Sequence, residues 1–151
     1  MNRQDRDILT LLQRDATLTH QALAEATGMS AATVWRRIQS MEAAGLIAGR
    51  VALVDARQAG LTTTVMTEVS LVDHSPDSRA AFERLVARSD EIQECYAVSG
   101  GHDYRLLIRV RDIEAYEHFL MEVLLANGAV RGAETHFVLR QIKYSTALAL
   151  E

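Results

Sequence analysis

The sequence has very little cysteine and proline, and it has no long apolar run. Its 151 residues include one cysteine and one proline, which excludes an internal disulfide framework and any zinc site built from several cysteines. No stretch approaches the ~18 consecutive apolar residues of a membrane-spanning helix, and no apolar run at the start resembles a signal peptide. A lone cysteine suits the reducing cytoplasm, where we expect the protein to act away from any membrane.

Positive charge is also scarce, since the formal net charge is −4. The deficit is uneven: residues 1–50 hold six arginines and five acidic residues, whereas the remainder holds ten basic and fifteen acidic residues. A surface that binds nucleic acid needs basic side chains to meet the phosphates. Any contact with DNA must therefore come from the N-terminal third. A single copy would bind weakly, so oligomerisation is expected.

What the chain does have is enough apolar material for packed cores. The composition is 48% hydrophobic and 24% charged, which favours folded structure over disorder. A chain of 151 residues suits one domain of ordinary size or two small ones.

Residues 21–45 carry the pattern of two short helices joined by a turn. Gly28 can adopt the left-handed conformation of such a turn, and the Ser30 hydroxyl can cap the second helix. Val34, Ile38 and Met41 recur at helical spacing and predict one buried stripe. The rest of this helix can reach phosphates and base edges, and the predicted DNA contacts are Ser30, Ala32, Thr33, Arg36, Arg37 and Gln39. The layout is typical of a helix-turn-helix, although an ordinary helical hairpin with a solvated basic face has the same local pattern.

An earlier helix completes the first domain. Residues 5–15 place Ile8, Leu11 and Leu12 on one stripe, and Thr19 can cap the next helix. We expect these helices to bury one small core within residues 1–50. Residues 46–54 alternate loosely around Gly49, which predicts a short β-hairpin or wing, and a wing strand with its linker is assigned to residues 51–61.

The second half has a different periodicity. Strands are predicted over residues 62–72, 92–99, 104–110 and 135–144, with helices starting at Ser75 and Asp112. The fold class is therefore α+β: an N-terminal helix-turn-helix (winged-helix-like) domain and a C-terminal ferredoxin-like βαββαβ domain over residues 62–151. Both helices must cover one sheet face. The other face is only half polar, which predicts self-association.

Together these fragments resemble the Lrp/AsnC family, the feast/famine regulators, along essentially the whole chain. The resemblance rests on Asp5 with Asp7-Ile8-Leu9, on Gly28-Met29-Ser30, on Val34-x-x-Arg37-Ile38-x-x-Met41-Glu42-x-x-Gly45-x-Ile47, on Glu94-Cys95-x-x-Val98-Ser99-Gly100, and on Asp103-Tyr104. It implies a sequence-specific DNA-binding transcriptional regulator. It also implies that the second domain, the RAM or AsnC-type module, binds a small effector, often an amino acid, between subunits of a dimer or octamer.

The resemblance further implies an effector site, formed by Gly100, Gly101, His102, Asp103 and Tyr104 together with Glu134, Thr135 and His136. Asp103 would accept the ammonium of an amino acid, and a glycine-rich turn would offer N–H groups to its carboxylate. Asp103 could equally be an Asx-turn residue that ends a tight hairpin. His102 and His136 depart from the residues frequent in the family, which leaves the effector open. They have no evident third metal ligand, so neither a metal nor a cofactor is expected.

Two residues of the recognition helix have a second interpretation. Arg37 either meets a phosphate or forms a salt bridge with Glu42 or another nearby acid. Trp35 replaces a more usual aliphatic side chain and is predicted to be partly buried packing, with a DNA contact as the less favoured interpretation.

Two other functions share this architecture. One is a ligand-sensing module without its own regulatory output, which an intact recognition helix opposes. The other is a sirohaem-decarboxylase-like enzyme. Those enzymes carry a His-Asn-Tyr…Arg run at the place of Tyr96-Ala97-Val98-Ser99-Gly100, so here only His102 remains of it. No nucleophile–base pair stands out, and we expect no catalytic residues.

Overall fold

The computed structural model describes residues 1–150, which form two compact units. The first comprises Met1–Leu53 together with residues 142–150, and the second comprises Val54–Gln141. Within residues 1–150, none of the helices has the length and apolar character that a membrane crossing requires.

Three helices build the first unit: α1 (Arg3–Leu12), α2 (His20–Thr27) and α3 (Ala31–Ala43). Each begins at a side chain that accepts a backbone N–H of the first turn, and these caps are Asn2, Thr19 and Ser30. Such caps satisfy donors that the helix itself leaves free. Gly28 ends α2 with a φ of 69°, so the predicted left-handed turn and the predicted Thr19 and Ser30 caps are confirmed.

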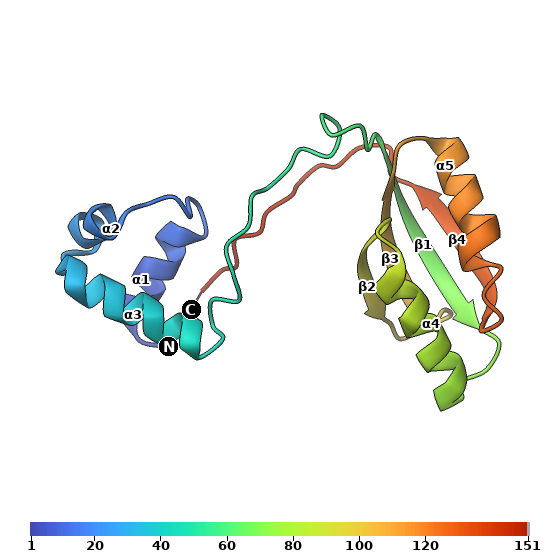
Figure 1. Cartoon of the computed structure of the whole chain (residues 1–151), viewed down its shortest axis with the longest axis horizontal. Coiled ribbons are helices and arrows are strands. Elements are labelled where there is room, and N and C mark those ends of the chain that lie inside the picture. Colours follow the sequence, from blue (N-terminus) through green and yellow to red (C-terminus); the bar gives the residue numbers. More distant parts are fainter. Residues whose placement is uncertain (151) are drawn as a thin grey trace. The chain divides into compact units, whose positions relative to one another are not determined.

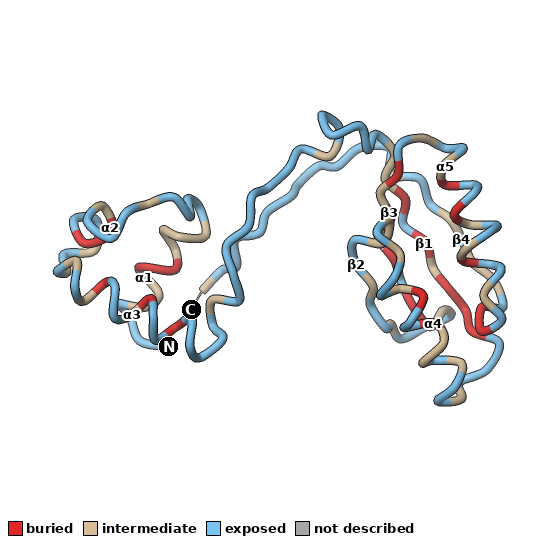
Figure 2. Tube along the Cα trace, in the orientation of Figure 1, coloured by how far each residue is buried: buried red, intermediate tan, exposed pale blue. Residues whose placement is uncertain are grey.

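The core of this unit is the predicted one, except that α1 contributes a different set of buried residues. Ile8, Leu23 and Val34 are fully buried, as are Ile38 and Met41 to within a few per cent. Figure 2 shows buried stretches on α1, α2 and α3. On α1 it is Leu9 that joins Ile8 in the core, whereas Leu11 and Leu12 are only partly buried at its margin. The helix is amphipathic as expected, but its apolar stripe is rotated by one position toward its start.

The predicted wing is wrong, because residues 46–54 contain no strand. The chain leaves α3 through Gly45 (φ 72°), and the Leu46 N–H donates to the Met41 carbonyl (2.9 Å), a six-residue closure typical of a glycine C-cap. Beyond it Val51, Leu53 and Val54 are exposed. Their loose alternation has no apolar surface to cover and no partner strand, which explains why it does not become a hairpin.

The C-terminal tail also joins the first unit, although the predicted second domain ran to residue 151. The Gln13 side chain exchanges two hydrogen bonds with the Leu148 backbone (2.7 and 3.3 Å), and Leu150 packs against the helical core.

The second unit is the predicted strand–helix–strand–strand–helix–strand. Its elements are β1 (Thr63–Leu71), α4 (Pro76–Arg88), β2 (Ile92–Ala97), β3 (Tyr104–Val110), α5 (Ile113–His118) with a π-helical continuation η1 (Phe119–Leu124), and β4 (Val130–Phe137). The sheet order is β2-β3-β1-β4, with every neighbour antiparallel. Figure 1 shows α4 and α5 on the same face of this sheet.

The last strand lies several residues before the predicted 135–144. In the sheet register Phe137 faces Val65, and the Val138 N–H donates to the Thr64 carbonyl (3.0 Å). Because β1 begins at Thr63, the chain has no partner strand beyond this point. Leu139 and Ile142, which lie within the predicted strand, are consequently exposed.

Strand alternation divides the sheet into a helix-covered face and an open face. On β1, Val65, Thr67 and Val69 are buried under the helices, whereas Met66 and Glu68 lie on the open face. The open face also receives Tyr96 from β2, Arg105 and Leu107 from β3, and Glu134 and His136 from β4. The predicted half-polar face is therefore present.

Candidate functional site

The exposed side of α3 carries the residues predicted to read DNA. Ala32, Arg36 and Gln39 are exposed, and Ser30 and Thr33 stand at the helix start, where the Ser30 hydroxyl accepts the Thr33 N–H (3.2 Å). The Gln39 amide already has a partner within the helix, since it donates to Glu42 (3.0 Å). A helix that buries one stripe on α1 and α2 and exposes an arginine opposite can present that arginine to a DNA groove.

Arg37 points to a different partner. Its guanidinium donates to the Asp5 carboxylate (2.9 Å) and to the Gln4 side chain, and the Arg37 and Asp5 side chains are 27% and 19% exposed. The predicted salt bridge is thus confirmed, with Asp5 on α1 as the acid in place of Glu42. Glu42 pairs with Arg50 instead (2.9 Å). Arg37 ties α3 to α1, and its phosphate contact stays a prediction.

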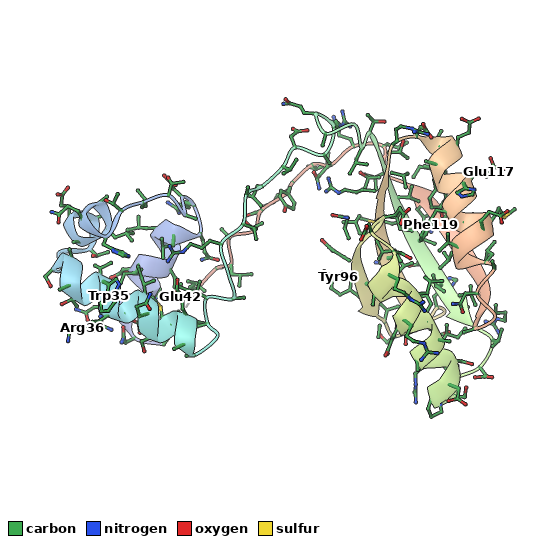
Figure 3. The ribbon with its side chains drawn as sticks, in the orientation of Figure 1. Trp35, Arg36, Glu42, Tyr96, Glu117 and Phe119 are labelled. Atoms are coloured by element: carbon green, nitrogen blue, oxygen red, sulfur yellow. The ribbon has the colours of Figure 1, made fainter. Side chains whose placement is uncertain are left out.

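Trp35 corrects the sequence interpretation. It was expected to be partly buried packing, but it is 50% exposed, and Figure 3 shows it beside Arg36 on α3. The reason is geometric: the residue after Val34 is turned about 100° away from the buried stripe. A large exposed aromatic next to an arginine belongs to the same surface as the predicted DNA contacts.

In the second unit, the turn between β2 and β3 is held by backbone bonds around Asp103. The Val98 N–H donates to the Asp103 carbonyl (3.0 Å), and Gly100 has a φ of 123°, a conformation open chiefly to glycine. The Asp103 carboxylate accepts the Leu71 N–H on Oδ2 (2.8 Å), and its Oδ1 lies 2.7 Å from His74 Nε2. The Leu71 N–H, and after it His74, hold the pKa of Asp103 below its usual value. Asp103 is therefore the anchor of a turn in this structure, and ammonium binding by it stays a prediction.

The structure does not bring all eight predicted effector residues together. Tyr104 is buried under the helices, with its ring centroid 4.5 Å from that of Phe82. The Thr135 hydroxyl lies 2.6 Å from the Tyr116 hydroxyl, also on the helix-covered face. His102, Glu134 and His136 instead meet on the open face, so the predicted set is divided between two sides of the sheet.

The open-face group has an ordered geometry. His102 Nε2 lies 3.4 Å from Glu68 Oε2 and 3.3 Å from Glu134 Oε2. The Glu68 Oε1 accepts from Arg105, whose guanidinium holds the pKa of Glu68 below its usual value. His136 Nε2 lies 3.3 Å from Glu134 Oε1. Carboxylates of Glu68 and Glu134, directly opposite each other on β1 and β4, are thus bracketed by three nitrogen-bearing side chains.

A cleft of about 480 Å³ opens beside this group, lined by Glu68, Ala97, Val98, Ser99, Gly101, His102 and Arg105. Gly101 and His102 were predicted as site residues, whereas Glu68, Arg105 and residues 97–99 were not. The sequence pattern could have identified two of these residues, Glu68 and Arg105. Alternation in the two central strands places Glu68 and Arg105 on the open face, and their cross-strand pairing follows from the strand order.

Comparison with known proteins points to one family for both units. Residues 64–148 match the family model described as Lrp/AsnC ligand binding domain, and residues 1–48 match winged helix-turn-helix DNA-binding. The chain is 31% identical over 151 residues, all of it and 99% of the relative, to the DNA-binding transcriptional activator DecR of Escherichia coli K12.

Two solved structures share the fold over nearly the full chain. An AsnC family transcriptional regulator from Agrobacterium tumefaciens superposes with a TM-score of 0.93 at 39% identity, covering 99% of this chain and 97% of that one. The transcriptional regulator NMB0573 of Neisseria meningitidis, in complex with L-Met, has a TM-score of 0.95 at 31% identity, with coverage of 99% and 96%.

Proposed function

The chain belongs to the Lrp/AsnC family of DNA-binding transcriptional regulators, and from this premise we propose that α3 reads its DNA sites and that an amino acid controls it. The observation that carries the first part is the contrast between adjacent arginines. Arg37 is held against Asp5, whereas Arg36 is exposed beside Trp35. An exposed arginine can pair with guanine in the major groove or with a backbone phosphate.

The effector part rests on the chemistry of the cleft beside His102. A free amino acid carries one ammonium and one carboxylate, and the cleft offers the Arg105 guanidinium and the Glu68 carboxylate on neighbouring strands. The turn contributes Gly101, which lacks a side chain and lets a ligand approach the backbone. The L-Met complex of NMB0573 supports an amino acid as the ligand class.

A thermal-shift screen of the twenty amino acids, run in EDTA, tests this part. A ligand that binds only the folded protein raises its melting temperature by mass action. We expect one or a few amino acids to do so, and Arg105→Gln to abolish the shift. Arg109→Gln is the matched control, because Arg109 follows on the same strand but does not line the cleft. A shift that survives Arg105→Gln would remove the cleft from the proposal.

We also propose a homo-oligomer, a dimer that assembles further to an octamer, formed through the open sheet face. Met66, Tyr96 and Leu107 give this face apolar area that a second copy would cover. Light scattering of the full chain should report at least a dimer, and Leu107→Glu should shift it toward monomer. Ile113→Glu, at an exposed position on α5, should leave the mass unchanged. A monomeric wild type at micromolar concentration would contradict the proposal.

The protein is further proposed to be a cytoplasmic regulator without catalytic activity. The relatives reported above are named as regulators. A visible absorbance spectrum separates the sirohaem-decarboxylase alternative, since a bound tetrapyrrole would absorb there. A gel-shift titration separates a sensing module without regulatory output, which would bind no DNA.

A further inference from the structure

The group around His102 has a geometry that DNA binding does not explain. One histidine nitrogen faces two carboxylate oxygens from two other segments, and all three atoms lie within 4.8 Å of one another. From this we propose that Glu68, His102 and Glu134 bind a divalent transition-metal ion of the zinc class. Glu68 and His102 also line the cleft proposed for the effector, so a bound ion would share that cleft, whereas the proposal does not involve α3.

The separations fit the coordination sphere of such an ion. Zinc bonds to nitrogen and oxygen ligands are about 2.0–2.2 Å long, which places neighbouring ligands of a tetrahedron about 3.3–3.6 Å apart. His102 Nε2 lies 3.4 Å from Glu68 Oε2 and 3.3 Å from Glu134 Oε2. The Glu134 side chain is 57% exposed, so a small rotation can close the remaining edge. Three protein ligands leave a fourth position for water or another ligand.

The surroundings orient each ligand atom toward the centre. His102 Nδ1 lies 3.1 Å from the Ser70 hydroxyl, an arrangement that fixes the ring and directs Nε2 at the carboxylates. Glu68 uses its other oxygen for Arg105, and Glu134 has its other oxygen beside His136. In both carboxylates the outer oxygen is thus engaged, and the inner oxygen faces His102.

The charges around His102 also favour a bound cation. Glu68 and Glu134 stand directly opposite each other across β1 and β4, and like charges at such positions repel. Arg105 compensates one of them. In the described part of the chain neither Arg105 nor another arginine pairs with Glu134, and a dication at the centre would attract both carboxylates at once. The histidine nitrogen favours zinc-class ions over Mg²⁺, which prefers an all-oxygen octahedron.

Isothermal titration of the EDTA-stripped full chain with Zn²⁺ tests the proposal. Wild type should bind one ion per chain, and Mg²⁺ should not bind there. His102→Ala and Glu134→Gln should each weaken zinc binding at least tenfold, and Ser70→Ala should weaken it about 10- to 100-fold through loss of the ring's orientation. His118→Ala, at an exposed position on α5, is the control and should bind like wild type.

Circular dichroism separates metal loss from unfolding. Because the Glu134 side chain is largely exposed, Glu134→Gln should remain folded even if His102→Ala does not. Equal zinc affinity in wild type and Glu134→Gln would overturn the proposal. The absence of zinc binding in the wild type would overturn it as well.

Discussion

Truncation of the two neighbouring arginines of α3 should have different effects. Arg36→Ala should weaken DNA binding, and Arg37→Ala should lower the stability of the fold. Arg36→Ala removes an exposed side chain, and surface substitutions of this kind change stability by no more than about 0.5 kcal/mol. The same change should weaken specific DNA binding by about 1–3 kcal/mol, a loss of roughly 5- to 150-fold in affinity. If Arg36 meets a phosphate, the loss should be equal on all sequences and should reduce the salt dependence.

Arg37→Ala acts on the fold first. The Arg37–Asp5 pair is neither fully buried nor fully exposed, since its side chains are 27% and 19% exposed. Its truncation leaves the Asp5 carboxylate without its cation and removes the bond to Gln4. Hydrogen bonds to charged groups contribute about 1.5–3 kcal/mol. The free energy of unfolding of the helical domain should therefore fall by about 1–3 kcal/mol. Urea denaturation followed by circular dichroism measures this loss.

The assay is a fluorescence-anisotropy titration of labelled duplex DNA with both variants, paired with urea denaturation of each. Arg36→Ala should have wild-type stability and weakened binding, whereas Arg37→Ala should have reduced stability. Equal affinity of Arg36→Ala and wild type would refute the assignment of α3's exposed side. Equal stability of Arg37→Ala and wild type would refute the role of the Asp5 pair.

Three further changes test the fold around both sites. Tyr116→Phe should lower the free energy of unfolding by about 1–3 kcal/mol, because the buried Thr67 hydroxyl loses its partner (3.0 Å); urea denaturation measures this. Asp103→Asn should reduce stability at neutral pH. Because the pKa of Asp103 is lowered in the folded state from its usual 3.8, the wild-type advantage should persist above that pH and disappear as the pH falls below it. Gly28→Ala should cost about 1 kcal/mol or more in thermal denaturation, since its φ of 69° is unfavourable for alanine.

Local signals explain why the helical domain could be predicted in detail. The Thr19 and Ser30 caps and the Gly28 turn each depend on residues within one helical turn of the position concerned. The predicted wing is wrong because a hairpin depends on non-local contacts. Alternation in residues 46–54 is a local pattern, but a hairpin needs a surface to cover, and that surface is not specified locally.

The open-face group lies beyond what the sequence predicts. The sequence offers His102 and His136 with no evident third metal ligand. The carboxylates that lie near His102 belong to Glu68, on the first strand, and to Glu134, which the sequence predicts as an effector residue. Only the strand order and register bring these residues together. Asp103 illustrates the same limit, since its Leu71 and His74 partners come from the end of another strand and the loop after it.

Selection of binding sites from random duplex DNA tests the central claim most directly. Full-length wild type should enrich one defined sequence over successive rounds, and Arg36→Ala, folded by circular dichroism, should enrich it weakly or not at all. Failure of the folded wild type to enrich any sequence, or identical enrichment by Arg36→Ala, would contradict sequence-specific recognition through the exposed side of α3.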